Sequence, residues 1–456
     1  MKKERFLSLF LILVLFASFT PAAFAKNSFE VDARAALLID VGTGEALYDK
    51  NADERNYPAS ITKVMTALLT LEAVDAGRLG FEQEITAQAS AFENLASDGS
   101  TANIKAGERM SVENLLNCLL IVSANEAAHI LAEAVAGDID SFVAMMNQRA
   151  GELGCTNTHF ANPSGLHNER HYTSAWDIYL ITSEALKHDE FREIVGRKAY
   201  DVPATNVSKA RTLHSTNYLI STWRTGWPGY YYENARGIKT GSTPEAGYCL
   251  VANAEHGGRT LISVVLGAER VTLPDGTLET RSFTESVKLL EHGFNDFRSM
   301  NLIDTSEFVC EVPVELSSET NYVIVHPATE LYRMVPADIT AETMERTIEL
   351  YAESVEAPVA EGDALGRMTV SYNGVEYGSA ELIALNDVSA SWLLTKQRDV
   401  QKFFAQSWVR LAAIGVGVAA VGITVLRLAF GSRSRRYGGR RGGSGQYSGY
   451  RGRRKR

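Results

Sequence analysis

Two apolar segments, one near each end, confine the folded part of this 456-residue chain to the residues between them. The first, residues 6–19, follows three basic residues and is itself followed by small residues at positions 23 and 25. A basic start, an apolar run and a small-residue cleavage site are typical of a secretory signal. Because this run is short for a membrane-spanning helix, residues 1–25 are predicted to be a signal peptide.

The second apolar segment, residues 411–426, carries no charge and lies between Arg410 and Arg427. Extended to residues 408–430, it would cover about 34 Å as a helix, which exceeds the ~30 Å hydrocarbon core of a bilayer if both arginines snorkel outward. Its apolar character on every side fits a surface-lying amphipathic helix less well. We therefore expect a transmembrane helix at residues 408–430.

The charges beside this segment predict its orientation. Residues 427–456 contain eleven Lys and Arg and no Asp or Glu. Positive charge directly after a span marks the cytoplasmic side of the membrane. We expect the acidic part before the span to lie outside the cytoplasmic membrane, and residues 431–456 to form a basic cytoplasmic tail. The Arg/Gly-rich tail also resembles nucleic-acid-binding segments, but topology explains its charge more simply, so no nucleic-acid partner is expected.

Between the two ends, the hydrophobic pattern predicts strands, then a helical middle, then strands again. This order favours an α+β domain whose antiparallel sheet is built from both ends of the sequence, with the helices packed on it. We assign it to residues 26–300. The predicted strands are 33–40, 45–49, 247–254 and 261–268. The first predicted helix begins near Ser60, and the others cover 112–122, 126–135, 138–153, 174–188 and 284–297.

The pattern of predicted secondary structure changes near residue 301. Short strand-like runs follow one another up to residue 390, and one of them contains the hairpin signal Asn373-Gly374. We expect a small all-β domain at residues 301–390 and a polar helical connector at residues 391–407, which leads into the predicted span.

Composition adds little to this picture. Hydrophobic residues make up 45% and charged residues 22% of the chain, as in an ordinary globular protein. A chain of this length does not need disulfides, so its scattered cysteines are as compatible with buried thiols as with bridges. They are Cys118, Cys155, Cys249 and Cys310.

Ser60 and Lys63 stand at the start of the first predicted helix, shortly after Pro58. Positions i and i+3 share a helix face, so the hydroxyl and the amine can meet. A serine needs a neighbouring base to act as a nucleophile. A lysine can be that base when burial and nearby positive charge lower its pKa. Taken alone, this S-x-x-K pattern is common, and a solvated serine and lysine are the usual outcome.

Two further motifs could place polar groups in a cleft. Ser123-Ala124-Asn125 lies between two predicted helices, where it could aim a hydroxyl and an amide into a cleft or simply cap a helix. Lys239-Thr240-Gly241 precedes a predicted strand, where the lysine and hydroxyl could bind a carboxylate and the glycine could admit a ligand. Each motif alone is more often a turn. The three in this order form a much more specific signal.

Together the motifs resemble those of the penicillin-recognising serine enzymes, and most closely the low-molecular-weight penicillin-binding proteins with D-alanyl-D-alanine carboxypeptidase activity. The likeness covers residues 30–297 strongly and the β-domain loosely. It implies a penicillin-binding/β-lactamase-like transpeptidase domain, in which an antiparallel sheet carries a helical subdomain. The spanning helix departs from the family, which usually ends in an amphipathic surface helix. The similar phrases are PASITKVMT at 58–66, SANEAA at 123–128, NPSGL at 162–166, HYT at 171–173 and GIKTG at 237–241.

The resemblance also implies a role for each motif residue. Ser60 would be acylated by the penultimate D-Ala of a peptidoglycan stem pentapeptide, with Lys63 as general base and no cofactor. Ser123 would relay a proton to the leaving amine. The backbone N–H groups of Ser60 and Ser242 would form an oxyanion hole, and β-lactams would be covalent inhibitors. The implied substrate-binding residues are Asn125, Lys239, Thr240, Gly241, Ser242 and, as the arginine for the terminal carboxylate, Arg281.

Three other functions share some of these features. A serine β-lactamase has the same three motifs, but the E-x-x-L-N-type loop that class A members use for fast deacylation is absent from this sequence. A zinc peptidase could use His167 and His171, whose H-x₃-H spacing suits zinc, although no H-E-x-x-H motif accompanies them. A catalytically silent peptidoglycan-binding protein or β-lactam sensor could keep the same fold.

Overall fold

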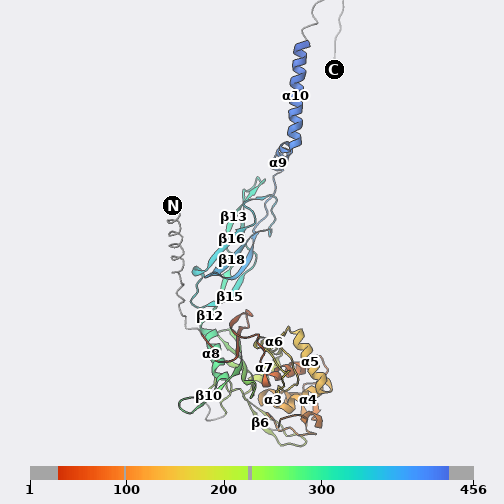
Figure 1. Cartoon of the computed structure of the whole chain (residues 1–456), viewed down its shortest axis with the longest axis vertical. Helices are drawn as coiled ribbons and strands as arrows, with labels where there is room; N and C mark the ends of the chain where they lie inside the picture. Colours follow the sequence, from red (N-terminus) through yellow and green to blue (C-terminus); the bar gives the residue numbers. More distant parts are fainter. Residues whose placement is uncertain (1–28, 97–98, 224–228, 431–456) are drawn as a thin grey trace, which may run out of the picture. The chain divides into compact units, whose positions relative to one another are not determined.

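The computed structural model describes residues 29–96, 99–223 and 229–430 (Figure 1). They divide into two compact units. The first holds the described residues up to Leu302 together with Tyr332–Met344, and the second holds Ile303–Leu331 and the described residues from Glu345 onward. The predicted signal peptide at residues 1–25 and the predicted basic tail at residues 431–456 lie outside the described residues.

The first unit is built on an antiparallel sheet of five strands in the order β2-β1-β9-β8-β7. Strands β1 and β2 come from the start of the chain, and β7, β8 and β9 come from about two hundred residues later. Ala35 of β1 lies opposite Leu266 of β9, and Asp40 lies opposite Leu261. The prediction of a sheet assembled from both ends of the domain is therefore confirmed. The strands are β1 (Ala35–Asp40), β2 (Ala46–Lys50), β7 (Ala235–Thr243), β8 (Gly247–His256) and β9 (Arg259–Ala268).

Strand β1 is buried along its whole length because both faces of the sheet are covered. Alternate side chains of a strand point to opposite faces. Leu37 accordingly joins the large core cluster on the helical face, whereas Leu38 joins a second cluster with Leu289 and Leu290 of helix α8. The helices of this unit are α2 (Lys63–Asp75), α3 (Val112–Ile121), α4 (Asn125–Ala136), α5 (Ile139–Glu152), α6 (Ala175–Ala185), α7 (Asp189–Gly196) and α8 (Arg281–Asn295).

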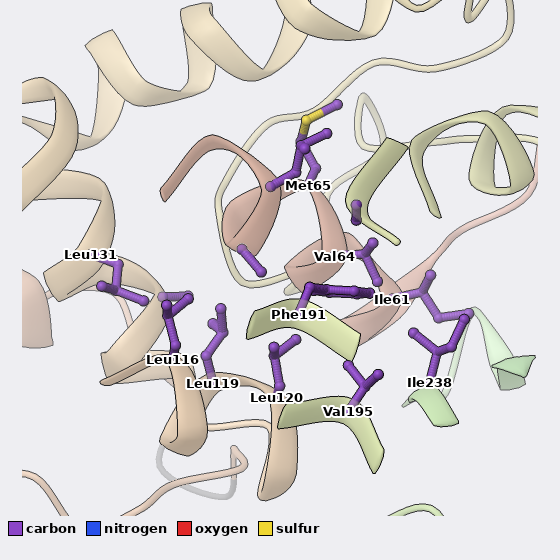
Figure 2. Packing of buried hydrophobic residues seen from close by; sticks show 14 of the residues in the cluster. Ile61, Val64, Met65, Leu116, Leu119, Leu120, Leu131, Phe191, Val195 and Ile238 are labelled. Carbon is purple, nitrogen blue, oxygen red and sulfur yellow. The ribbon is translucent and has the colours of Figure 1, made fainter. Parts of the chain in front are cut away.

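Figure 2 shows how the large cluster supports the segment that carries Ser60 and Lys63. Ile61 and Val64 lie beside the ring of Phe191 from α7, and Val195 and Ile238 lie close by. Full burial of a side chain such as Phe191, which is 0% exposed, contributes about 1.5–3 kcal/mol. Helix α7, which the sequence pattern did not predict, thus helps to fix the start of α2.

Two local features differ from the sequence-based expectations. Ser60 lies in a short 3₁₀ helix, η1 (Ala59–Thr62), and the α-helix starts only at Lys63. The motif Lys239-Thr240-Gly241 lies inside β7 rather than before a strand. Several short elements were also not predicted: η2 (Ala89–Phe92) and the strand pairs β3 (Glu84–Thr86) with β4 (Arg109–Ser111), β5 (Ala199–Val202) with β6 (Arg211–His214), and β10 (Arg270–Thr272) with β11 (Leu278–Thr280).

The second unit confirms the predicted β-rich texture after residue 301. Its six-stranded sheet has the order β16-β18-β19-β14-β13-β17. The β18–β19 hairpin turns at Asn373 and Gly374, both with positive φ, as a tight two-residue turn requires. The strands of this sheet are β13 (Cys310–Glu315), β14 (Tyr322–Pro327), β16 (Glu345–Leu350), β17 (Val355–Glu356), β18 (Ala364–Tyr372) and β19 (Val375–Ala384). The strand pair β12 (Phe297–Ile303) and β15 (Leu331–Pro336) belongs to the first unit apart from one residue of each strand, and η3 (Ala341–Thr343) belongs to it entirely.

Two helices follow the β-sheet of the second unit, α9 (Trp392–Ala405) and α10 (Ser407–Phe430). Helix α10 has a mean hydropathy of 2.1 and only 6% of its apolar stretch is buried. Its length and composition are sufficient to cross a membrane.

All four cysteines are free thiols. Burial raises the pKa of Cys118 to about 12 and that of Cys249 to about 11. A thiol reacts through its thiolate, so both thiols have low reactivity at neutral pH. Of the two possibilities that the sequence left open, unbridged thiols are the correct one.

The first prediction concerns Gly165, which has a φ of +82° and lies against the turn before Ser60. A Cβ at this position would stand 1.9 Å from the Ala59 carbonyl oxygen. We expect Gly165→Ala to lower the free energy of unfolding by at least ~3 kcal/mol, because backbone strain adds to the clash. The matched control is Gly151→Ala in α5, where nothing lies within 4 Å; it should stabilise by about 0.5–1 kcal/mol. Equal urea midpoints for the two variants would contradict this.

Candidate active site

Lys63 is the centre of the site that the motifs predicted. Its side chain is 0% exposed, and its Nζ lies 2.9 Å from Ser60 Oγ, 2.8 Å from Asn125 Oδ1 and 2.6 Å from the Ser164 carbonyl oxygen. These partners come from η1, from the start of α4 and from the loop before α6. The structure thus brings the first two motifs into direct contact.

The three partners of Lys63 differ in what they can donate. Asn125 Oδ1 and the Ser164 carbonyl oxygen can only accept hydrogen bonds, whereas the Ser60 hydroxyl can also donate. A charged ammonium would donate to all three groups. A neutral amine has two protons and one lone pair, so it satisfies every group only by donating to Asn125 and Ser164 and accepting from Ser60. Loss of one proton therefore aims the lone pair of Lys63 at the serine hydroxyl.

Burial makes the neutral state of Lys63 accessible. The pKa of Lys63 is lowered well below its usual value, first by removal of the amine from water and then by the charge of Lys239, while Glu126 acts in the opposite sense. Lys239 is itself 1% exposed, and its burial lowers its pKa to about 7. Near neutral pH the two lysines thus disfavour being charged at the same time.

Ser123 occupies a strained turn between α3 and α4, with a φ of +64°. Positive φ is uncommon for a residue other than glycine and is often found at functional sites. The Ser123 Oγ is buried and has no hydrogen-bond partner among the described residues, and α4 has no side-chain cap at its start. The helix-capping interpretation of this motif is therefore wrong. The backbone instead holds an unsatisfied hydroxyl beside the pocket described next.

The three motifs meet at a pocket of about 210 Å³. Ser60, Ser123, Thr240, Gly241 and Ser242 all line it, whereas Lys63, Asn125 and Lys239 lie buried behind these residues. The third motif approaches the first very closely, because a Cβ on Gly241 would lie 3.0 Å from the Ser60 backbone nitrogen and 2.9 Å from the Pro58 oxygen. A glycine at this position is needed to bring β7 alongside the turn of Ser60. Other lining residues are Thr216, Tyr218, Tyr248, Arg270 and Phe283.

Arg281 is not among the residues that line this pocket. It begins α8, and its guanidinium pairs with Asp32 and lies 3.9 Å from Glu279. The arginine that lines the pocket in the described part of the chain is Arg270. Its Nε donates to Thr280 Oγ1 at 3.0 Å, and its guanidinium lies 4.6 Å from the centre of the Tyr248 ring. Arg281 is thus placed away from the described lining of this pocket, whereas Arg270, which the sequence analysis did not single out, lines it.

Thr216 was also missed, because a lone threonine in a loop carries no sequence signal. Its Oγ1 lies 2.9 Å from Thr240 Oγ1, and its backbone N–H donates to the Ile121 carbonyl at the end of α3. Thr216 therefore connects the strand that carries the third motif to the helix that precedes the second.

His171 serves the turn of Ser60 rather than a metal site. Its Nδ1 accepts from the Ala161 N–H at 3.1 Å, so its Nε2 carries the proton and donates to Thr62 Oγ1 at 2.8 Å. Thr62 in turn donates to the carbonyl of Ala59, whose φ is +47°. Both ring nitrogens of His171 are thus occupied, and desolvation lowers its pKa to about 3. This arrangement argues against the zinc interpretation of His167 and His171.

Comparison with known proteins agrees with this geometry. The D-alanyl-D-alanine carboxypeptidase family matches residues 22–270, and the C-terminal domain of penicillin-binding protein 5 matches residues 297–390. The chain is 31% identical to the D-alanyl-D-alanine carboxypeptidase DacF of Bacillus subtilis, over 86% of this chain and 96% of that protein.

Solved structures give the same result. The D-alanyl-D-alanine carboxypeptidase DacD from Francisella tularensis superimposes with a TM-score of 0.64 at 26% identity, covering 79% of this chain and 95% of that one. Penicillin-binding protein 5 from Haemophilus influenzae superimposes with a TM-score of 0.58 at 29% identity, covering 79% and 98%. The motifs, the sheet and both matched regions lead to one conclusion: the chain belongs to the D-alanyl-D-alanine carboxypeptidase family.

Proposed function

We propose that this chain is a serine-type D-alanyl-D-alanine carboxypeptidase that removes the terminal D-Ala from peptidoglycan stem pentapeptides. The observation that carries the proposal is the environment of Lys63, in which only Ser60 can give a proton to the neutral amine. The family match and the similar carboxypeptidase from Bacillus subtilis support this activity. The comparisons favour neither a β-lactamase nor a silent binding protein.

In the proposed reaction, Ser60 Oγ attacks the carbonyl carbon of the penultimate D-Ala while its proton moves to the neutral Lys63 amine. The carbonyl oxygen becomes an oxyanion, for which the backbone N–H groups of Ser60 and Ser242 are the proposed donors. The close contact of Gly241 with the Ser60 nitrogen supports this pairing, since it brings β7 beside η1.

The tetrahedral intermediate then collapses with cleavage of the peptide C–N bond. Ser123, whose hydroxyl has no hydrogen-bond partner among the described residues, is proposed to relay the proton that Lys63 took from Ser60 to the leaving amine of the terminal D-Ala, which returns Lys63 to its neutral state. Water subsequently attacks the ester carbonyl while Lys63 accepts a proton from it. The bond to Ser60 Oγ then breaks, Lys63 returns the proton to Ser60, and the shortened peptide leaves. A β-lactam would acylate Ser60 in the same way.

The terminal carboxylate of the substrate is proposed to bind at the β7 side of the pocket. Thr240 and Arg270 line this pocket, and the buried Lys239 donates from its Nζ to the Thr240 carbonyl at 2.8 Å. Asn125, which holds Lys63 in this structure, is proposed to contact the substrate backbone as well. We propose Arg270 in place of Arg281 as the arginine for the carboxylate.

We also propose a domain organisation and a location for the protein. The catalytic domain at residues 26–300 would be exported by the signal peptide at residues 1–25 and lie outside the cytoplasmic membrane. The β-domain at 301–390 and the connector at 391–407 would join it to a single span at 408–430, and the tail at 431–456 would remain in the cytoplasm. The apolar α10 supports the span.

The proposed function predicts a covalent adduct on Ser60. Incubation with penicillin should give a long-lived penicilloyl group on the tryptic peptide that contains Ser60, and incubation with a D-Ala-D-Ala-ended pentapeptide should release D-alanine. Mass spectrometry and a D-alanine assay measure the two results. Thr70→Ala is a control, since Thr70 is buried in α2 and bonded to its own helix. An adduct on Ser123, or rapid penicillin turnover without D-alanine release, would refute the assignment.

The two buried lysines predict a bell-shaped dependence of kcat/KM on pH. Activity should rise as Lys63 loses its proton, because only the neutral amine accepts one from Ser60. It should fall as pH passes about 7, where Lys239 loses the charge that attracts the carboxylate. Lys239→Arg keeps its charge, so the falling limb should move up by at least ~2 pH units while the rising limb remains. Lys63→Ala should lose at least ~10²–10⁴-fold in acylation rate.

This pH prediction fails if Lys239→Arg retains the wild-type falling limb, because the titrating group would then be a different one. It also fails if Lys63→Ala is acylated at the wild-type rate. Each variant is checked by circular dichroism to confirm that it is folded.

The proposed topology predicts opposite accessibility on the two sides of α10. Ser389→Cys and Ser444→Cys are introduced into a background without the four native cysteines, and intact cells are treated with a membrane-impermeant thiol reagent. Position 389 should be labelled, while position 444 should be labelled only after the cells are permeabilised. Equal labelling of both positions in intact cells would mean that the helix does not span the membrane.

A further inference from the structure

The β10–β11 hairpin contributes two neighbouring side chains to the pocket at Ser60. Arg270 begins β10 and Thr280 ends β11; the two lie directly opposite each other in the antiparallel pair, and both line the pocket. The Arg281 N–H donates to the Glu269 carbonyl at 2.9 Å, so the pairing continues into the first residue of α8. Arg270 is therefore carried by a strand whose partner strand leads directly into that helix.

Thr280 occupies the position at which a threonine usually caps a helix. It immediately precedes α8 and has an extended backbone conformation, and a threonine hydroxyl at such a position normally accepts from an N–H of the first turn. In the described structure the Thr280 hydroxyl makes no such bond. It instead accepts from Arg270 Nε at 3.0 Å. The hydroxyl at the start of α8 thus contacts the arginine and not the helix.

Thr280 is itself held firmly. It is only 1% exposed, and its backbone N–H donates to the Tyr230 hydroxyl at 2.7 Å. The Tyr230 ring is also buried and stacks on the ring of Phe283, with 4.9 Å between the ring centres. Stacked aromatic rings hold each other in a defined orientation. The acceptor that contacts Arg270 therefore has a fixed position.

Tyr248 restricts the same guanidinium from its face. The Arg270 Cζ lies 4.6 Å from the centre of the Tyr248 ring, a distance at which a cation is attracted to an aromatic face. Tyr248 belongs to β8 and lies opposite Ser242 of β7. Because the bond to Thr280 uses Nε, it sets the direction in which the two Nη groups point. Arg270 is exposed, so without these contacts its long side chain would sample many rotamers.

We propose that Thr280 is a positioning residue that fixes the direction of the Arg270 guanidinium and so sets how strongly the enzyme prefers a substrate with a free terminal carboxylate. This inference rests on the proposed function, in which Arg270 binds that carboxylate. Arginine recognises a carboxylate through paired N–H bonds of defined geometry. A guanidinium that is already held in one direction loses less conformational entropy when it forms them. Thr280 acts through Arg270 and has no part in the bond-breaking steps.

The test compares two thioester substrates of the full chain in detergent. Both carry the same acyl-D-Ala group; one releases thioglycolate, which has a carboxylate, and the other releases its neutral amide. Thiol release gives kcat/KM for each, and the ratio of the two values measures carboxylate recognition. We expect the wild type to prefer the carboxylate. Thr280→Val should lower the ratio about fivefold, as expected when one long side chain must be ordered on binding, and mainly through KM.

Three further variants show that the effect depends on the hydroxyl and on Arg270. Thr280→Ser keeps the hydroxyl and should keep the wild-type ratio. In an Arg270→Gln background, Thr280→Val should cause no further change, because the two residues act as one unit. Thr272→Val lies at an exposed position of the same hairpin, outside the pocket lining, and is the matched control with an unchanged ratio. Thr280→Ala removes the same hydroxyl if the valine variant does not fold.

Each outcome decides for or against this role of Thr280. Equal loss on both thioesters would indicate a merely structural role and overturn the inference. It is also overturned if serine fails to restore the ratio, if Thr280→Val still lowers the ratio without Arg270, or if the wild type shows no preference for the carboxylate. Failure of the proposed function would appear differently, as a wild type that neither releases thiol nor carries a penicilloyl group on Ser60.

Discussion

The burial of the Lys63 amine is the constraint on which the catalytic unit depends. An ammonium withdrawn from water is unfavourable unless hydrogen bonds compensate it. Here the compensation comes from Ser60, Asn125 and Ser164, which lie on three separate segments. Folding must therefore complete the helical subdomain before the lysine has its partners. The desolvation that makes the buried ammonium unfavourable also lowers the pKa of Lys63. Burial therefore both requires the three hydrogen-bond partners and makes the neutral amine available as a base.

The turn before Lys63 is also fixed by several specific contacts. Ala59 has a positive φ, which an L-residue adopts only when surrounding contacts require it. Its carbonyl accepts from Thr62, and Thr62 is held by His171. Gly165 presses against the same carbonyl, where no side chain fits. Contacts from the NPSGL and HYT phrases thus fix the direction of Ser60, which explains in physical terms why these phrases accompany the S-x-x-K motif.

Sequence reasoning was most effective where side-chain type and spacing determine contact. The i, i+3 spacing of Ser60 and Lys63 predicted their hydrogen bond, and the order of strand-like and helical segments along the chain predicted the sheet. It was least effective where a backbone group or a residue from a distant loop makes the contact. The Ser164 carbonyl carries no residue-type signal, Thr216 is an ordinary loop residue, and the choice of Arg270 over Arg281 depends on the β10–β11 hairpin, which the pattern did not reveal. Taken alone, the Ser123 motif was more often a helix cap, and its positive φ together with the uncapped start of α4 shows otherwise.

Because the two buried lysines are close together, binding of the substrate can change which of them carries a proton. Because the charge of Lys239 lowers the pKa of Lys63, the state in which both are protonated is disfavoured, and the pair titrates as a coupled unit. Before substrate arrives, one shared proton could reside on either amine. A carboxylate that binds beside Thr240 stabilises a charge on Lys239 more than one on Lys63, since the Lys239 Nζ donates to the Thr240 carbonyl whereas the Lys63 Nζ contacts Ser60, Asn125 and Ser164. Its arrival therefore selects the arrangement in which Lys239 is charged and Lys63 is neutral, and the proposed base becomes available when the peptide is in place.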